Sequence, residues 1–303
     1  MADWVGAVGV AVQPLVDRLR EKLHQQACLH ADETPVATLD PGTGKTRQSY
    51  FFAYRSTAGP PIIVFDYTTS RSGSHAREFL GGWRGALMVD DYGGYKALFN
   101  AGVIELACWV HVRRKFVEAA KASGSPLAHE AVERIGALYR IEADARAQGL
   151  RGEALHAHRN AHAPPVLTAL HDWLQTQSVN ALPSSGFGNA VNHALKRWPA
   201  LLRYLDNGER PIDNNPIENS IRPITLGRKN WLFIGATRAG ERAAAIMSLL
   251  ATAKANGVCP HAWLSDVLAR LPTTRNRDID QLLPIEGWVP VSTSDQAQSE
   301  RLG

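Results

Sequence analysis

The sequence predicts an α/β protein: a mixed sheet with helices on both faces, interrupted by a large all-helical segment. Residues 28 to 110 alternate short runs rich in aromatic and β-branched residues with short helical stretches, in the order βββαβαβ. From residue 111 to residue 205, apolar residues recur at three- and four-residue steps, and almost nothing there predicts strand. Because consecutive elements usually pack side by side, this order favours one mixed sheet whose connections carry the helices.

Composition limits the class of protein. With 303 residues, 45% of them hydrophobic, the chain can bury a sizeable core in one large domain or two moderate ones. Its net charge of +4 permits a nucleic-acid partner without requiring one. Three widely spaced cysteines argue against a disulfide framework and favour a reducing cytoplasm. We find no secretory leader and no apolar run of membrane-spanning length, so we expect no membrane contact.

The amino-terminal part is predicted to supply the sheet. An amphipathic helix is expected from Trp4 to Gln26, with a bend at Pro14. Three strands then form a meander, with a turn at residues 41–45; they are Cys28–Leu39, Ser49–Arg55 and Pro61–Tyr67. The next four elements alternate helix and strand; they are Ser74–Leu80, Gly85–Asp90, Tyr95–Asn100 and Val103–Val110.

The remainder is predicted to be helical. The helices expected first are His111–Ala122, Leu127–Gln148, Gly152–His162, Pro165–Gln177 and Phe187–Leu205. Another helix should begin beside Pro216, and two more cover Gly240–Ala255 and Pro260–Leu271. The polar stretch Asn276–Gly303 is predicted to be a loosely attached tail. The predicted domains are an amino-terminal helix (1–27), a sheet domain (28–116 and 206–258), a helical insertion (117–205), and a helix with a tail (259–303).

Three acidic residues are candidate metal ligands. Asp32 lies inside the first strand, Asp90 ends the fourth, and Glu218 opens the helix after the helical segment. If the first and fourth strands are neighbours, Asp32 and Asp90 stand side by side, and two partly desolvated carboxylates need a cation between them. Mg²⁺ or Mn²⁺ suits such ligands, and two ions about 4 Å apart can flank both oxygens of a phosphodiester displacement. Asp91 is the rival of Asp90, but adjacent strand residues point to opposite faces, so only one should reach the site.

Glu218 has two competing interpretations. Asn215 followed by Pro216 is typical of a helix start with proline at its first position. That start puts Glu218 at the third helical position, where its side chain can bond back to the N–H of the cap residue. A start at Asp213 or Asn214 instead turns Glu218 toward the sheet.

Basic residues follow the fifth strand and surround Glu218. Arg113, Arg114 and Lys115 fit either a solvated helix face or a track for nucleic-acid phosphates. The candidate contacts near Glu218 are Arg222, Arg228, Lys229 and Asn230.

Cys108 and His111 have the spacing of a zinc half-site, with Cys28 and His30 as the other half. We favour other roles: Cys108 as a small apolar residue of a buried strand, and His111 as a group near the metal site that contacts a phosphate or an acid. Three aromatic residues are predicted to lie in the core rather than to stack on bases: Trp109, Trp231 and Phe233.

Seven segments stand in a characteristic order along the chain. They are HADETPV around Asp32, VDDYGGY around Asp90, CWVHVRRKF from Cys108, RIGALYRIEA from Arg134, DNNPIENSIRP around Glu218, LGRKNWLFIG from Leu226 and GERAAAIMSLLATAKANGV from Gly240. In this order they resemble the catalytic part of the insertion sequence 66 family of DDE transposases, which are enzymes of bacterial mobile elements. The resemblance implies a ribonuclease H-like core with the helical insertion between the second and third catalytic acids.

The resemblance also implies a role for each acid. The first catalytic acid falls on Asp32, the second on Asp90, with Asp91 in place of a glycine, and the third on Glu218. Together they would hold two Mg²⁺ or Mn²⁺ ions.

The implied activity is that of a DNA transposase, a polynucleotidyl transferase that cuts the ends of an insertion sequence and joins the 3′-hydroxyl to target DNA. The implied partners are transposon-end and target DNA, further copies of the chain in a homodimer or higher oligomer on DNA, and accessory proteins of the element. The implied location is the bacterial cytoplasm, on the nucleoid.

Two departures from the family pattern leave alternatives open. After the third acid the family usually has Arg, where this chain has Asn219 and then Ser220, so one phosphate contact is expected to be missing. Larger members carry an amino-terminal portion with helical and zinc-binding segments, so we expect a truncated or split copy. The alternatives are a catalytically inactive DNA-binding remnant and a host nuclease of the same fold.

Overall fold

The computed structural model describes residues 2–285 and 287–290. Its contacts divide the chain into two compact units. The strand unit is built from the residues up to Trp83, from Gly94–Leu98 and from Ile217 onward, and the helical unit from Arg84–Gly93 and Phe99–Pro216. Among the described residues, no helix is both long enough and apolar enough to cross a bilayer.

Five strands form a mixed sheet in the order β3-β2-β1-β4-β5, so the fold is mixed α/β. The strand unit contributes an antiparallel meander of β1 (Cys28–Asp40), β2 (Lys45–Ser56) and β3 (Ile63–Thr68). The helical unit contributes the parallel pair β4 (Ala86–Val89) and β5 (Ile104–Ala107). The predicted meander is confirmed, and β4 stands next to β1 in the strand order.

Each unit also contains helices. Those of the strand unit are α1 (Ala2–Ala11), α2 (Gln13–His24), α3 (Gly73–Leu80), α9 (Asn215–Trp231, from Ile217 on), α10 (Thr237–Ala255) and α11 (Pro260–Arg270), with the 3-10 turn η3 (Asn276–Leu282). Those of the helical unit are α5 (Trp109–Ser123), α6 (Pro126–Ala147), α7 (Gly152–Asn180) and α8 (Gly186–Leu202), with η2 (Arg203–Asp206). The short elements η1 (Gly93–Tyr95) and α4 (Lys96–Asn100) have residues in both units.

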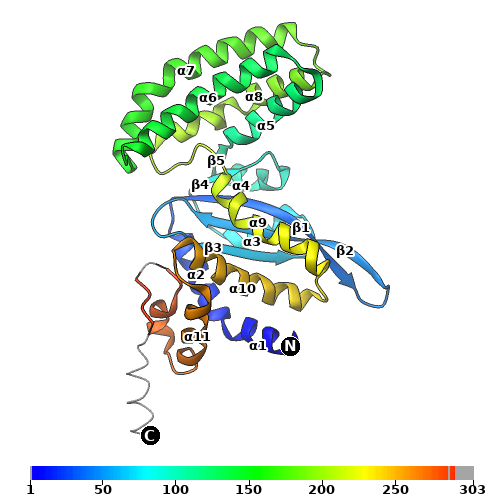
Figure 1. The fold of residues 1–303 in the computed structure, drawn as a ribbon, viewed down its shortest axis with the longest axis vertical. Coiled ribbons are helices and arrows are strands. Elements are labelled where there is room, and N and C mark those ends of the chain that lie inside the picture. The colour runs from blue at the N-terminus through cyan, green and yellow to red at the C-terminus, as the bar shows by residue number, and fades with distance from the viewer. Residues whose placement is uncertain (1, 286, 291–303) are drawn as a thin grey trace. The chain divides into compact units, whose positions relative to one another are not determined.

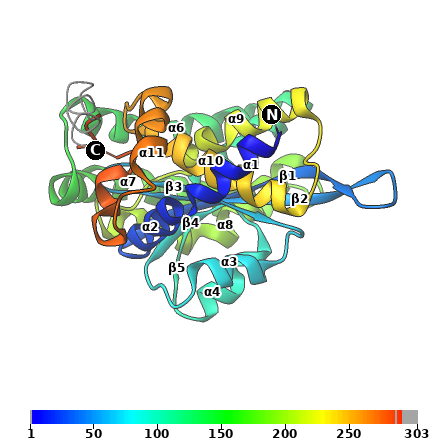
Figure 2. The ribbon, with the colours of Figure 1, turned by 90° about the horizontal axis from the view of Figure 1, so that it is seen from below.

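The register of β1 with β2 decides which side chains face which helices. Thr34 lies opposite Phe51, so even-numbered residues of β1 share a face with odd-numbered residues of β2. On that face Val36 and Phe51 belong to one core cluster with residues of α9 and α10. The other face carries Tyr54, whose ring stacks on Phe79 of α3 with ring centroids 3.9 Å apart. Figure 2 shows α9 and α10 on one side of the meander and α3 on the other.

Helix α10 also covers the outer edge of β3. The N–H of Phe65 donates to Ser248 Oγ at 2.8 Å, and the N–H of Ile63 donates to Thr252 Oγ1 at 3.0 Å. The Thr252 hydroxyl in turn donates to the carbonyl oxygen of Ile63 at 3.0 Å. Ser248 and Thr252 are fully buried. These hydroxyls therefore satisfy backbone groups that a further strand would otherwise satisfy.

Residues 276–285 are docked rather than loose. Ile279 and Leu282 are buried, and the indole N–H of Trp263 donates to the Leu282 carbonyl at 2.9 Å. Asp280 pairs with Arg18 and Lys22 of α2. The predicted tail is therefore wrong over this stretch, because apolar residues within a polar sequence anchor it. Within the rest of that predicted tail, residues 286 and 291–303 lie outside the described residues.

Helices α5 to α8 pack against one another around a common core, and Figure 1 shows them side by side. Trp109 belongs to that core, and its indole N–H donates to the Leu201 carbonyl at 3.1 Å. The sequence predicts strand as far as Val110, but β5 ends at Ala107 and α5 begins at Trp109. Packing of Trp109 among helices explains why the apolar run CWV does not continue the strand.

One continuous helix, α7, replaces two predicted helices. Pro164 and Pro165 lie inside it, although each proline removes a helical hydrogen bond. Buried residues continue along one face through the proline pair, from Arg159 and Ala163 to Leu167. The predicted break is wrong because this packing outweighs the local preference against proline.

A buried ion pair joins α6 to α7. Arg159 donates to both carboxylate oxygens of Glu142, at 2.7 and 2.8 Å. Its remaining nitrogen donates to the carbonyl oxygens of Tyr204 and Arg210, at 3.2 and 2.8 Å. Arg159 is 3% exposed and Glu142 is 9% exposed, so the guanidinium depends on these partners for solvation.

We predict that Glu142→Leu lowers the free energy of unfolding by about 3–5 kcal/mol, because it leaves the Arg159 charge buried and uncompensated. Urea denaturation measures the change. Glu130→Leu is the control, since it removes a partly exposed pair with Arg134 on the same helix and should change stability by less than about 1 kcal/mol. Equal stability of Glu142→Leu and wild type would contradict the assignment.

Candidate active site

Asp32 lies on the face of β1 that α9 covers. It is opposite Ala53 of β2, and Ala53 belongs to the same core cluster as Ile217 and Ile221 of α9. The Asp32 side chain is half-buried, and its Oδ1 accepts the backbone N–H of Glu33 at 2.8 Å. The first predicted acid is thus held on a rigid strand beneath a helix.

Glu33 points to the opposite face and is locked there. Its side chain is 1% exposed, and its Oε1 accepts Nε and Nη2 of Arg71 at 2.9 and 2.6 Å. The hydroxyl of Tyr95 donates to Oε2 at 3.0 Å. These bonds compensate the burial of the charge and fix the strand beside Asp32. The sequence analysis did not single out Glu33; the available signal was a second acid next to Asp32 in a strand of alternating faces.

Helix α9 begins at Asn215, so Glu218 is its fourth residue. The N–H of Asn215 donates to Asp213 Oδ1 at 3.0 Å, and the N–H of Asn214 donates to Cys108 Sγ at 3.2 Å. Both candidate cap residues therefore give their N–H groups to acceptors other than Glu218, which argues against the interpretation of Glu218 as a capping-box residue. The Glu218 side chain is half-buried.

Arg55 brings a positive charge to the same face as Asp32. Its β1 partner is His30, two residues before Asp32, and its Nη1 donates to Ser220 Oγ of α9 at 3.0 Å. Burial lowers the pKa of Arg55. A guanidinium from β2 therefore reaches the part of α9 that directly follows Glu218, where the family resemblance leads us to expect an arginine.

In the helical unit, Asp90 directly follows β4, as predicted. Its Oδ1 accepts the N–H of Tyr92 at 2.8 Å. Asp91 instead pairs with Nη1 of Arg197 of α8 at 3.2 Å, and its Oδ2 lies 3.6 Å from Nδ1 of His193 on the same helix. Burial lowers the pKa of His193 to about 4, so this imidazole is neutral at pH 7. The two adjacent acids thus have different partners, although both follow the end of β4 and strand alternation does not apply to them.

The predicted ligands are divided between the units. Asp32 and Glu218 belong to the strand unit, and Asp90 belongs to the helical unit. Taking the described residues of each unit alone, no three His, Cys, Asp or Glu side chains are grouped to hold a metal ion. The donor chemistry of the three acids, all carboxylate oxygen, nevertheless suits a hard cation such as Mg²⁺.

The predicted phosphate contacts fall into two groups. On α5, Arg113, Arg114 and Lys115 are exposed, and His111 is half-buried in the first turn. On α9, Arg222, Lys229 and Asn230 are exposed. Arg228 differs from these, because its Nη1 donates to the Pro35 carbonyl at 2.6 Å and so ties α9 to β1.

Cys108 is a buried thiol rather than a prepared zinc ligand. It is 3% exposed, and burial raises its pKa to about 12, which disfavours the thiolate that zinc requires. Cys108 is buried as predicted, but it follows the end of β5 rather than lying in the strand, and its Sγ accepts the N–H of Asn214.

Two family models match the chain. The model described as Transposase IS66 family matches residues 1–242, and the model described as IS66 C-terminal element matches residues 248–285. The chain belongs to the IS66 transposase family.

Relatives of this IS66 transposase chain occur in Sinorhizobium fredii. Uncharacterized protein y4jD is 34% identical over 297 residues, which cover 93% of the chain and 58% of the relative. Uncharacterized protein y4hP is 33% identical over 318 residues, which cover 97% of the chain and 56% of the relative. The chain therefore spans a little more than half the length of these relatives.

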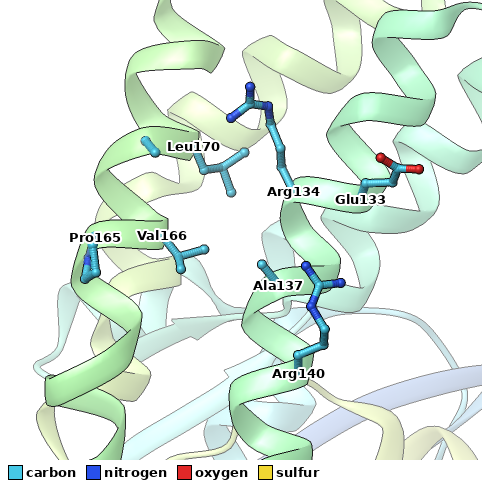
Figure 3. Close-up of a pocket in the computed structure, with 8 residues that line it drawn as sticks. Glu133, Arg134, Ala137, Arg140, Pro165, Val166 and Leu170 are labelled. Carbon is cyan, nitrogen blue, oxygen red and sulfur yellow. The ribbon is translucent and has the colours of Figure 1, made fainter.

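A groove of about 480 Å³ lies between α6 and α7 of the IS66 chain. Figure 3 shows Arg134 and Arg140 of α6 on one side and Pro165, Val166 and Leu170 of α7 on the other. Glu133 is the one acid among the lining residues, which are otherwise apolar or basic. The groove therefore lacks the paired carboxylates of a two-metal site, and we do not assign the catalytic centre to it.

A second cavity, of about 290 Å³, lies in the strand unit among α2, β3 and α10. Asp66 of β3 lines it, together with Arg20 and Glu241. Burial raises the pKa of Asp66 to about 6, from an ordinary value of 3.8, and the nearby charges of Glu78 and Glu241 act in the same direction. Folding therefore stabilises the neutral form of this carboxyl relative to the unfolded chain, and the carboxyl ionises in the folded protein only as pH rises through about 6.

We predict that Asp66→Asn raises the free energy of unfolding at pH 8 by on the order of 1–3 kcal/mol, because the raised pKa means that ionised Asp66 destabilises the fold. The wild type should lose stability as pH rises from about 4 to about 6, whereas the variant should not. Chemical denaturation across this pH range measures both. Asp17→Asn, an exposed acid on the same cavity, is the control and should follow the wild type. A variant less stable than wild type at pH 8 would contradict the prediction.

Proposed function

We propose that this chain is the catalytic part of a DNA transposase with a ribonuclease H-like core, and that Asp32, Asp90 and Glu218 are its catalytic carboxylates. The observation that carries the proposal is the family match over residues 1–242. The position of β4 next to β1 in the strand order supports it, because Asp32 lies on β1 and Asp90 directly follows β4. Helix α9 packs on the face of β1 that carries Asp32, which supports Glu218 of α9 as the third catalytic carboxylate.

The three carboxylates would hold two Mg²⁺ or Mn²⁺ ions, taking ligands from both units. Bound ions would supply an ionised water or hydroxyl as the nucleophile and would stabilise charge on the leaving oxygen. The chain prepares Asp32 for this role through Glu33, whose bonds to Arg71 and Tyr95 hold the strand on its other face. A carboxylate on a fixed strand loses little freedom when it binds a cation.

Two phosphoryl-transfer steps follow in the proposed reaction. In the first, a water oxygen attacks phosphorus at the end of the element, the P–O3′ bond breaks, and the 3′ oxygen takes a proton. In the second, that 3′-hydroxyl attacks a phosphodiester of the target DNA, loses its proton, and displaces a target 3′ oxygen, which is protonated. The second step exchanges one phosphodiester for another, so it needs no external energy source.

Basic side chains and one amide would hold the DNA phosphates. The exposed groups proposed for this are Arg113, Arg114 and Lys115 on α5, and Arg222, Lys229 and Asn230 on α9. Arg55 would supply the positive charge that Asn219 and Ser220 do not. A homodimer or higher oligomer on DNA, accessory proteins of the element, and a location on the bacterial nucleoid belong to the same proposal.

We predict that Asp32→Asn lowers the rate of Mg²⁺-dependent cleavage of DNA bearing the ends of the element by about a hundredfold or more. Its melting temperature should stay close to wild type, because Asn can still accept the Glu33 N–H. Asp91→Asn is the matched control and should retain cleavage, since Asp91 pairs with α8. An unchanged rate for Asp32→Asn would remove Asp32 from the mechanism.

The same assay separates the alternative functions. DNA binding with steep salt dependence but no strand breakage by the wild type would identify an inactive DNA-binding remnant. Strand breakage without joining would identify a nuclease of the same fold. Neither outcome depends on the Asp32 variant.

A further inference from the structure

The turn that follows α9 directs two apolar side chains into solvent. Trp231 and Ile234 pack on the core cluster of the strand unit. Between them, Leu232 is 67% exposed and Phe233 is 44% exposed. The prediction that Phe233 lies in the core is wrong. Solitary exposed apolar residues are common, but two adjacent ones between the partly buried Trp231 and the buried Ile234 form a projecting pair.

The backbone of this turn adopts a conformation that leucine avoids. Leu232 has φ +60°, the only positive φ of a non-glycine residue among the described residues. The N–H of Phe233 donates to the Trp231 carbonyl at 2.6 Å, which closes a tight three-residue turn around Leu232. Glycine would adopt this conformation without a steric penalty. Leucine at this position therefore indicates a use for its side chain.

Contacts on both sides hold the turn in place. The N–H of Ile234 donates to the Ala37 carbonyl at 2.8 Å, and the N–H of Leu39 donates to the Ile234 carbonyl at 2.8 Å. On the other side the indole of Trp231 lies against Gly227, where an added Cβ would be only 2.8 Å from the ring nitrogen. The strand and the indole thus fix the direction in which Leu232 and Phe233 project.

The charge around the projecting pair suits a polyanion. From Asn219 to Gly240 the chain contains four basic residues and no acid; the basic residues are Arg222, Arg228, Lys229 and Arg238. Arg222, Lys229 and Arg238 are exposed. An apolar projection flanked by exposed cations has the chemistry of a side-chain wedge that enters DNA between bases while cations contact the phosphates.

We propose that Leu232 and Phe233 form such a wedge and that Phe233 stacks on a DNA base. This inference rests on the DNA-binding part of the proposed function and specifies the form of DNA bound. Inserting a wedge requires unstacking, which costs least where bases are already unpaired or at a junction. The wedge therefore selects junctions between duplex and single-stranded DNA over continuous duplex.

The test uses the full chain, a fluorescent junction DNA and a continuous duplex of the same sequence. Phe233→Ala should weaken binding to the junction about 5- to 150-fold, the range for loss of one stacked base, and should change duplex binding much less. Phe233→Trp should retain the preference. With 2-aminopurine at the junction, the fluorescence change on binding of wild type should disappear in Phe233→Ala.

The Leu232→Gly variant distinguishes a role of Leu232 in DNA binding from a role in packing. Glycine relieves the positive φ, so the variant should melt at a higher temperature than wild type. It also removes the side chain, so junction binding should weaken. A leucine needed only for packing would give the opposite result for stability. Trp4→Ala is the control, because Trp4 is an 80% exposed aromatic residue on α1, which has no basic residue.

Three results would decide against the wedge. Equal binding of junction DNA by wild type and Phe233→Ala would overturn it while leaving the proposed function intact. A change in sedimentation of Phe233→Ala with unchanged DNA affinity would overturn it in favour of contact between copies of the chain. Absence of any DNA binding by wild type would count against the proposed function itself, and the wedge with it.

Discussion

Side chains alternate strictly along β1, and the assignments of Asp32 and Glu33 depend on this alternation. Asp32 faces α9, and Glu33 faces the opposite side, where Arg71 and Tyr95 hold its carboxylate. A shift of the strand register by one residue would exchange the faces of the two acids. Asp32 would then meet Arg71, and the longer side chain of Glu33 would lie under α9. Pairing of β1 with β2 from Leu29 to Asp40 opposes such a slip along the whole strand. The buried bonds of Glu33 oppose it locally, so a structural carboxylate protects the position of its functional neighbour.

Helix α9 combines stabilising and functional features in the same residues. An acid in its first turn and two basic residues in its last turn complement the helix dipole, and a stripe of buried isoleucines fixes it on the meander. These features would stabilise the helix in any protein. What distinguishes this helix is the position of its two ends, since Glu218 lies near its start and the strained turn at Leu232 follows its end. The helix therefore sets the distance between the proposed chemistry and the proposed DNA contact.

Much of the strand unit could be predicted from local patterns, because each strand carries a clear run of β-branched and aromatic residues. The three candidate acids could also be found, since each lies at the end or middle of a recognisable element. Other features required tertiary information. The continuity of α7 through Pro164 and Pro165 depends on a buried face supplied by its neighbours. The same holds for Phe233, because its apolar side chain gives no sign that the preceding residue turns it outward. The partner of Ser220, Arg55, lies 165 positions away, beyond the reach of any local pattern.

The buried hydroxyls of Ser248 and Thr252 have a consequence for how copies of the chain can associate. An edge strand with free N–H and carbonyl groups invites a strand from another molecule to extend the sheet. Here α10 occupies the outer edge of β3 with its own hydroxyls, so backbone groups at Ile63 and Phe65 are already bonded. Extension of the sheet across β3 would have to break these bonds and displace a helix from the core. The fold thus protects itself against fibre-like growth along the β3 edge.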